Sequence, residues 1–256
     1  MVKKLIFLVT KSLLINWYII NSINVHLLYS GCGIQPSRIV GGHEATPYSL
    51  PWQVGLVIPK SDKPFCGGTL ISPRHVLTAA HCTRANSGNW DIMVGEYRIT
   101  NSSDGTRHTK CRHINHPSYG KITGIDHDFA IVHLDTPVQL GSRAVPACLP
   151  TVALHGGNIL DDKTFTVSGW GTTCYGTCSS PDVLHVVSVS GVSNAICKQL
   201  YGGIFGQESI TSDMMCAGDV ENGKIDACQG DSGGIYSHKS SKSKKMLECI
   251  PSLKSK

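Results

Sequence analysis

The stretch Asp226-Ala227-Cys228-Gln229-Gly230-Asp231-Ser232-Gly233-Gly234 decides how the rest of this chain is interpreted. It places one serine between an aspartate and two glycines. A serine hydroxyl is a weak nucleophile at neutral pH, so chemistry at Ser232 requires a neighbouring base and hydrogen-bond donors for a developing oxyanion. A serine in this setting therefore predicts a histidine and a carboxylate elsewhere in the chain.

Three upstream segments carry candidate partners for this serine. Thr78-Ala79-Ala80-His81-Cys82 supplies a histidine, and Asp126-His127-Asp128-Phe129-Ala130-Ile131 supplies a carboxylate. Arg38-Ile39-Val40-Gly41-Gly42 contains a bond after arginine of the kind that proteolytic activation cuts. A single histidine, aspartate or serine would be an ordinary surface or turn residue. The four segments together, in this order, are far more specific than any one of them.

These segments resemble the trypsin/chymotrypsin family of serine proteases over residues 32–234. The resemblance implies an all-β fold of two antiparallel six-stranded β-barrels, with the active site between them. Composition independently favours an all-β chain, because 27 glycines accompany short apolar runs separated by turn residues. We expect strands at residues 53–58, 68–72, 75–79, 92–99, 107–114, 129–134, 163–168, 183–190, 213–217 and 234–237, and one short helix at 193–200.

The resemblance assigns a catalytic role to each chemical group. His81 matches the general base and acid, Ser232 the nucleophile, and Asp128 the carboxylate that orients the imidazole. The backbone N–H groups of Gly230 and Ser232 match the oxyanion hole. Asp128 is preferred over Asp126 because it directly precedes the apolar strand that follows the family's aspartate. Asp126 is then expected to be a surface turn residue.

Two further aspartates match a specificity site and a regulatory site. Asp226 corresponds to the floor of the primary specificity pocket, where a carboxylate favours Arg or Lys in the substrate. Cleavage between Arg38 and Ile39 would free an ammonium group that pairs with Asp231. The resemblance therefore implies a zymogen that another trypsin-like protease activates, and that protein protease inhibitors bind.

Eleven cysteines indicate an oxidising, extracellular compartment for a secreted protein. The resemblance implies three disulfides: Cys66–Cys82, Cys197–Cys216 and Cys32–Cys148. The pairing of the other five cysteines stays open: Cys111, Cys174, Cys178, Cys228 and Cys249.

Charge and small motifs limit the other partners. The net charge of +5 comes from the two ends, because the body between them holds 13 basic and 17 acidic residues. Nucleic acid is therefore not an expected partner. Asn101-Ser102-Ser103 is a glycosylation sequon. Glu96 resembles one anchor of a calcium loop, but Thr106 and Arg107 lack the second acid, so neither a metal nor a cofactor is expected.

The chain divides into four expected segments. Residues 1–30 have the basic start and apolar runs of a secretory signal, interrupted by Lys11, so a stable membrane span is not expected. Residues 31–38 form a propeptide stub, 39–238 the protease domain, and 239–256 a lysine- and serine-rich tail without regular structure.

The resemblance fails after Gly234, where Ile235 replaces the family's usual proline and no Ser-Trp-Gly segment or terminal helix follows. We therefore expect the second barrel to be incomplete at its C-terminal end. Two hypotheses remain open. The chain is a secreted endopeptidase acting on proteins or peptides with Arg or Lys, or it is a catalytically weak or inactive protease-fold protein that binds or acts as a decoy.

Overall fold

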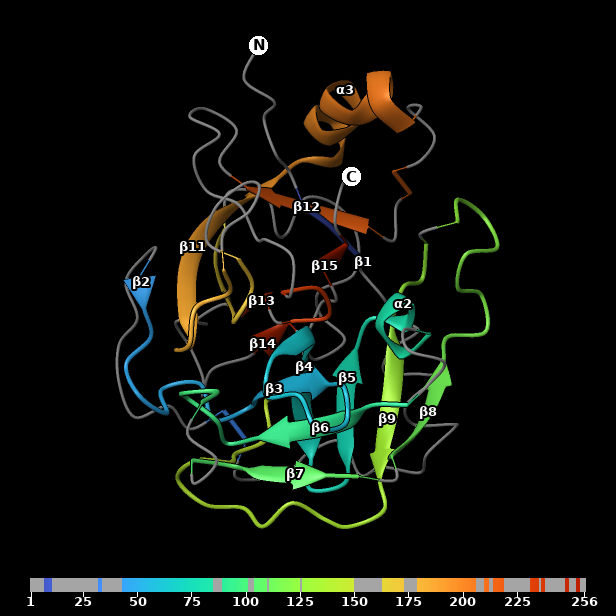
Figure 1. The fold of residues 1–256 in the computed structure, drawn as a ribbon. Helices are drawn as coiled ribbons and strands as arrows, with labels where there is room; N and C mark the ends of the chain where they lie inside the picture. The colour runs from blue at the N-terminus through green and yellow to red at the C-terminus, as the bar shows by residue number, and fades with distance from the viewer. Residues whose placement is uncertain are drawn as a thin grey trace.

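Two antiparallel sheets lie one above the other in Figure 1. The computed structural model describes residues 7–10, 32–33, 43–84, 89–100, 104–109, 111–124, 126–149, 163–172, 179–205, 210–211, 214–218, 231–234, 236–237, 247–248 and 252–253. Within these residues there are two helices, α2 (Ala80–Thr83) and α3 (Asn194–Phe205). The expectation of an all-β chain is confirmed, and no helix of the described part is long and apolar enough to span a bilayer.

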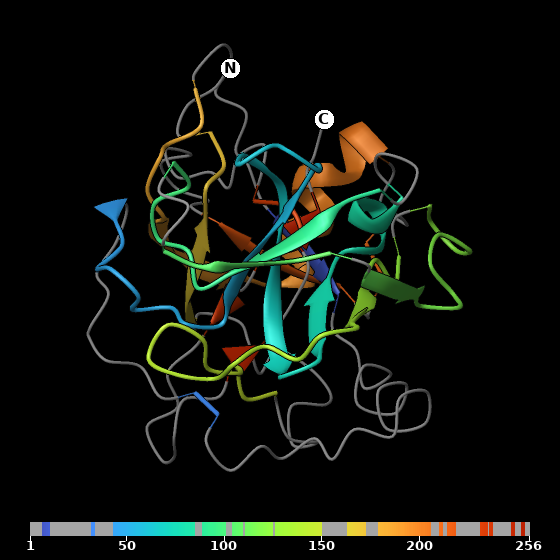
Figure 2. The same cartoon turned by 60° about the horizontal axis from the view of Figure 1, so that its bottom comes forward.

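The first sheet curls toward a closed barrel. Its strands are β3 (Gln53–Val57), β4 (Pro64–Ser72), β5 (His75–Thr78), β6 (Asp91–Val94), β7 (Thr106–His108), β8 (Cys111–Asn115) and β9 (Ala130–Leu134). They are ordered β7-β6-β3-β4-β5-β9-β8. The two edge strands, β7 and β8, are separated by only two residues of sequence, so one segment meets both ends of the sheet (Figure 2). The single strand expected at 107–114 is therefore split, which gives seven strands instead of six.

The second sheet is built from segments far apart in the sequence. It contains β1 (Phe7–Thr10), β2 (His43–Glu44), β10 (Thr164–Gly169), β11 (His185–Val192), β12 (Met214–Gly218), β13 (Tyr236–Ser237), β14 (Leu247–Glu248) and β15 (Ser252–Leu253). The order is β14-β13-β10-β11-β12-β1-β15, with β2 paired to β11.

Some strands of the second sheet were not expected from the sequence. β1 lies in the segment interpreted as a secretory signal, where it pairs antiparallel with β12. β14 and β15 lie in the segment for which composition indicates no regular structure. The division of the chain into signal, stub, domain and tail stays a prediction.

The core fills the first barrel and continues to the second sheet. All five residues of β3 and all four of β5 are buried, because both faces of these strands are covered. The largest fully buried side chains include Trp52, Phe129 and Trp170. Between the two sheets, the buried Ser168 hydroxyl donates to Gln53 Oε1 at 2.7 Å. This bond joins β10 of the second sheet to β3 of the first sheet. It therefore links the two halves of the molecule that carry the candidate site.

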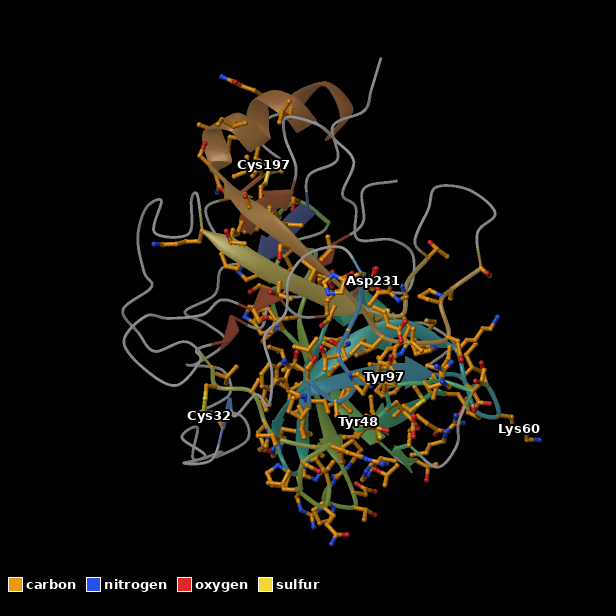
Figure 3. The ribbon with its side chains drawn as sticks, turned by 90° about the vertical axis from the view of Figure 1, so that its left-hand side faces the viewer. Cys32, Tyr48, Lys60, Tyr97, Cys197 and Asp231 are labelled. Carbon is orange, nitrogen blue, oxygen red and sulfur yellow. A yellow bond between two sulfur atoms is a disulfide. The ribbon has the colours of Figure 1, made fainter. Side chains whose placement is uncertain are left out.

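Three disulfides brace the described part, and they join the pairs that the resemblance implied. They are Cys32–Cys148, Cys66–Cys82 and Cys197–Cys216; Figure 3 labels Cys32 and Cys197 on the two halves of the molecule. Cys111 carries a free thiol and is half-buried. Cys174, Cys178, Cys228 and Cys249 lie outside the described residues.

The buried residue His75, which contacts the partly buried His133, makes the stability of the first barrel sensitive to acid. His75 Nδ1 lies 2.8 Å from Ser72 Oγ, and His75 Nε2 lies 3.2 Å from His133 Nδ1. Burial, with the neighbouring His133 and Arg74, lowers the pKa of His75 from 6.5 to about 4. Between about pH 6.5 and pH 4, His75 therefore binds a proton in the unfolded chain but not in the folded chain. We expect the free energy of unfolding to fall as the pH drops through this window, by up to about 3 kcal/mol from this group.

Urea unfolding between about pH 7 and pH 4.5 measures this effect. The His75→Gln variant keeps a polar side chain but cannot titrate there, so its loss of stability with acid should be visibly smaller. An unchanged pH dependence in the variant would contradict the assignment to His75.

Candidate active site

His81 and Asp128 form a close imidazole–carboxylate pair. The ring Nδ1 of His81 lies 2.6 Å from Asp128 Oδ2, and the His81 backbone N–H donates to Asp128 Oδ1 at 2.8 Å. Asp128 is fully buried, whereas the His81 side chain is 34% exposed. Because an ionised carboxylate only accepts, Nδ1 carries the proton in neutral His81 and Nε2 is left with a lone pair. The arrangement suits His81 to take a proton at Nε2.

Sheet register explains why these two residues meet. β5 and β9 are antiparallel partners, with Thr78 opposite Ala130. His81 comes three residues after Thr78, in helix α2, and Asp128 comes two residues before Ala130. The end of one strand and the start of the other lie at the same edge of the sheet. Strand pairing therefore brings together His81 and Asp128, which are 47 positions apart in the sequence.

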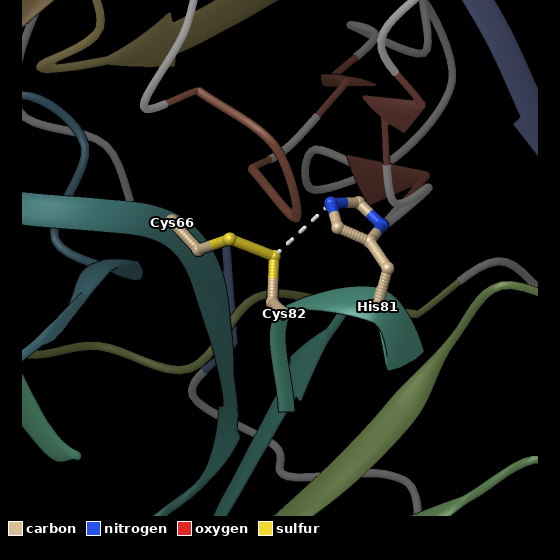
Figure 4. A group of neighbouring side chains, drawn as sticks. All are labelled: Cys66, His81 and Cys82. Atoms are coloured by element: carbon tan, nitrogen blue, oxygen red, sulfur yellow. Dashed lines mark hydrogen bonds between the residues drawn. A yellow bond between two sulfur atoms is a disulfide. The ribbon is translucent and has the colours of Figure 1, made fainter. Parts of the chain in front are cut away.

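The segment 231–234 brings Ser232 to the first barrel. The Gly67 N–H on β4 donates to the Ser232 carbonyl at 2.7 Å. The same carbonyl lies 3.6 Å from Cys82 Sγ, and this sulfur lies 3.5 Å from His81 Nε2 (Figure 4). Ser232 and the imidazole are thus neighbours of one disulfide. In the described part no hydrogen bond joins Ser232 Oγ to His81 Nε2, as is common for serine–histidine pairs without a substrate.

Glycine is required directly after Ser232. Gly233 has φ +80°, and a Cβ there would lie 2.5 Å from Thr78 Oγ1 and 2.6 Å from the Gly67 carbonyl. A side chain would force the turn away from β4. The absence of a side chain at Gly233 thus allows the turn to approach β4 and β5 closely.

Asp231 fastens the same turn to the second sheet. Its Oδ1 accepts the Gly171 N–H at 2.7 Å, just beyond the end of β10 (Figure 3). A Cβ at Gly169 or at Gly171 would overlap the Asp231 carboxylate. The turn is therefore held by Asp231 from one half of the molecule and by the Ser232 carbonyl from the other.

Several predicted site residues lie outside the described residues. These are the cleavage site Arg38–Ile39, the glycosylation candidate Asn101, the pocket aspartate Asp226 and the oxyanion-hole glycine Gly230. Their roles stay predictions.

Asp126 is not a surface turn residue, and that expectation was wrong. It is fully buried. Its carboxylate accepts the backbone N–H of Thr123 at 2.8 Å and that of Ile122 at 3.2 Å, and it lies 2.9 Å from His127 Nδ1. A charged residue in a loop suggests exposure when only the sequence is known. No pattern of charge or hydrophobicity in this loop indicated that it closes around the Asp126 carboxylate.

Possible metal ligands in the described part converge at one place only. Cys66, His81 and Cys82 lie together (Figure 4), but the two sulfurs form a disulfide and are not thiolates that could bind a metal. Glu96, the residue similar to a calcium-loop anchor, is partly buried. Burial, with the nearby Asp104, raises the pKa of Glu96 to about 7. This carboxyl is therefore about half protonated near neutral pH.

Comparison with known proteins gives consistent matches. A family model described as trypsin matches residues 39–244. Serine protease 1 of Rattus norvegicus is 36% identical over 203 residues, which are 77% of this chain and 73% of the relative. A trypsin of Phaedon cochleariae is 37% identical over 200 residues, 77% of this chain and 72% of the relative. Among solved structures, neuropsin, a serine protease expressed in the limbic system of mouse brain, matches with a TM-score of 0.64 and 28% identity, over 84% of this chain and 92% of that one.

Proposed function

The chain belongs to the trypsin family of serine proteases, and on that premise we propose that it is a secreted endopeptidase that cleaves after Arg or Lys through Ser232, His81 and Asp128. The observation that supports this most strongly is the His81–Asp128 pair, with Nδ1 2.6 Å from a fully buried carboxylate. Ser232, tied to β4 beside the neighbouring disulfide, supplies the nucleophile.

The proposed reaction follows from the tautomer of His81. Nε2 takes the hydroxyl proton as Ser232 Oγ forms a bond to the substrate carbonyl carbon. The oxyanion accepts hydrogen bonds from the backbone N–H groups of Gly230 and Ser232. His81 then gives the proton to the leaving amine as the C–N bond breaks. Water, deprotonated by His81 in the same way, hydrolyses the acyl-enzyme and restores the serine.

Substrate choice and activation are assigned to Asp226 and Asp231. Asp226 would hold the cationic side chain of the residue before the cleaved bond. Cleavage after Arg38 would free the amine of Ile39, which pairs with Asp231 as in the family. The tight packing of Gly169 and Gly171 against the Asp231 carboxylate supports a site that orders this loop. The activating enzyme is then a trypsin-like protease, and protein inhibitors are further partners.

Localisation and domain division are part of the same proposal. Residues 1–30 act as the secretory signal, 31–38 as a stub that the Cys32–Cys148 disulfide keeps attached after cleavage, and 39–238 as the protease domain. Three disulfides fit an oxidising compartment.

Ester hydrolysis by the full chain, cut after Arg38, tests the proposed function. We expect an arginyl ester to be hydrolysed at least about 10²-fold faster than a phenylalanyl ester, since the pocket carboxylate pairs only with the cation. The Ser232→Ala variant should show no turnover above background. If the chain with a free Ile39 amine hydrolyses neither ester, the endopeptidase assignment is overturned in favour of a non-catalytic binding protein.

A further inference from the structure

A second imidazole–carboxylate pair lies directly before Asp128. His127 Nδ1 is 2.9 Å from Asp126 Oδ2. Asp126 is fully buried and His127 is 5% exposed. Neither residue has a part in the reaction proposed above. One peptide bond joins this buried pair to Asp128, the carboxylate that orients His81.

Asp126 anchors the loop that leads to Asp128. Its carboxylate accepts the N–H groups of Ile122 and Thr123 and also the Thr123 hydroxyl, and its own carbonyl accepts the Gly120 N–H at 3.0 Å. Burial alone would raise the pKa of Asp126, but the bonds from Thr123, His127 and Ile122 outweigh it and leave the pKa below its ordinary value. The carboxylate is therefore ionised, and the loop is closed around its charge.

His127 has an unusual backbone conformation that its side-chain contacts support. Its φ of +51° is in the left-handed region, which a side chain with Cβ disfavours. The ring stacks on His116, with centroids 4.7 Å apart and planes within 6°. The His127 carbonyl accepts the Phe129 N–H at 2.8 Å, and the Phe129 carbonyl accepts the His116 N–H at 3.0 Å. Contacts on both sides of Asp128 thus hold a backbone that would otherwise relax.

We propose that Asp126 and His127 are positioning residues that hold Asp128 in the orientation in which both of its oxygens bind His81. This inference rests on the proposed function, because it assigns the two residues a role in the same reaction. The stack on His116 supports the left-handed turn, and the turn sets the direction in which Asp128 leaves the backbone. The two neighbouring carboxylates, Asp126 and Asp128, each accept a hydrogen bond from an imidazole of their own.

The arrangement is intact at neutral pH. The Ser118 N–H donates to His116 Nδ1 at 3.2 Å, so this nitrogen is an unprotonated acceptor. Burial, followed by the neighbouring His127, lowers the pKa of His116 to about 4; Lys121 acts in the same direction, and Asp126 opposes it. Protonation of His116 would break the bond to Ser118 and place a cation against the His127 ring.

Kinetics of the full chain, cut after Arg38, test the proposal in four variants. Asp126→Ala and His127→Ala are expected to lower kcat per titrated active site by about 10- to 100-fold, with KM within about twofold, because small misplacements of catalytic groups have effects of this size. Asp126→Asn and His127→Asn should recover part of the loss. Asparagine at 126 still accepts hydrogen bonds, and asparagine at 127 tolerates a positive φ and can donate to Asp126.

A merely structural role gives a different result. Variants with a purely structural defect would contain fewer active sites that can be titrated, but kcat per active site would be unchanged. That result would overturn the proposal. The matched control is Asp62→Asn, an exposed aspartate paired with Arg107, which should change neither quantity.

A measurement without turnover separates this inference from the proposed function. In the Ser232→Ala background, proton NMR detects the hydrogen between His81 Nδ1 and Asp128. Adding Asp126→Ala is expected to shift or broaden this resonance, while Asp62→Asn leaves it in place. An unchanged resonance in the Asp126→Ala chain contradicts the positioning role, whether or not the parent chain hydrolyses esters.

Discussion

Replacing Asp128 by asparagine is expected to lower kcat by about 10⁴-fold, the size of effect that this exchange has in serine-protease triads. The buried carboxylate now accepts from both the backbone N–H and Nδ1 of His81. Asparagine can accept only through its oxygen, so the amide NH₂ faces Nδ1 if the oxygen keeps the backbone bond. The proton of neutral His81 would then move to Nε2, where it blocks proton transfer from Ser232.

Ester hydrolysis normalised to titrated active sites measures this effect. The folded state should persist in the variant, because the side chain keeps its shape and one of its bonds. Circular dichroism and the midpoint of urea unfolding provide the check. A loss of less than about tenfold would show that Asp128 does not set the tautomer of His81.

Replacing Asp226 by serine is expected to lower kcat/KM for arginyl substrates by about 10²- to 10⁴-fold, since the substrate cation would be left without its carboxylate partner. Phenylalanyl substrates make no such pair, so their kcat/KM should stay within a few-fold of the parent value. The result is a loss of selectivity with retention of the chemistry.

The matched control for this variant is Asp182→Ser, which removes an aspartate that pairs with Arg98 near the protein surface. It should leave the preference for arginine unchanged. A full preference for arginine in Asp226→Ser would contradict the specificity assignment but leave the endopeptidase assignment standing.

Most strands could be predicted because short apolar runs end at turn residues. β3, β5, β9 and β11 lie within a few residues of their predicted bounds. The strand at 107–114 could not be predicted as two, because its division depends on pairing with different neighbours: β7 pairs with β6, and β8 pairs with β9. β1 could not be predicted either, because an apolar N-terminal run has the same pattern in a signal segment as in a strand.

Only part of the candidate site could be predicted from the sequence. The motifs around His81, Asp128 and Ser232 indicated the residues through family resemblance, and the pairing of β5 with β9 explains the contact of the first two. The burial of Asp126 and the stacking of His116 on His127 depend on how one loop folds over the start of β9. No local pattern of charge or hydrophobicity encodes such a contact.

Covalent labelling of Ser232 tests the central claim most directly. The full chain, cut after Arg38, is treated with diisopropyl fluorophosphate, in which attack by an activated serine oxygen forms an O–P bond and releases fluoride. Peptide mass spectrometry should find one phosphoryl group per chain, on Ser232, and almost none in the His81→Ala variant. Absence of the adduct, or equal labelling with and without His81, would contradict a serine activated by this histidine.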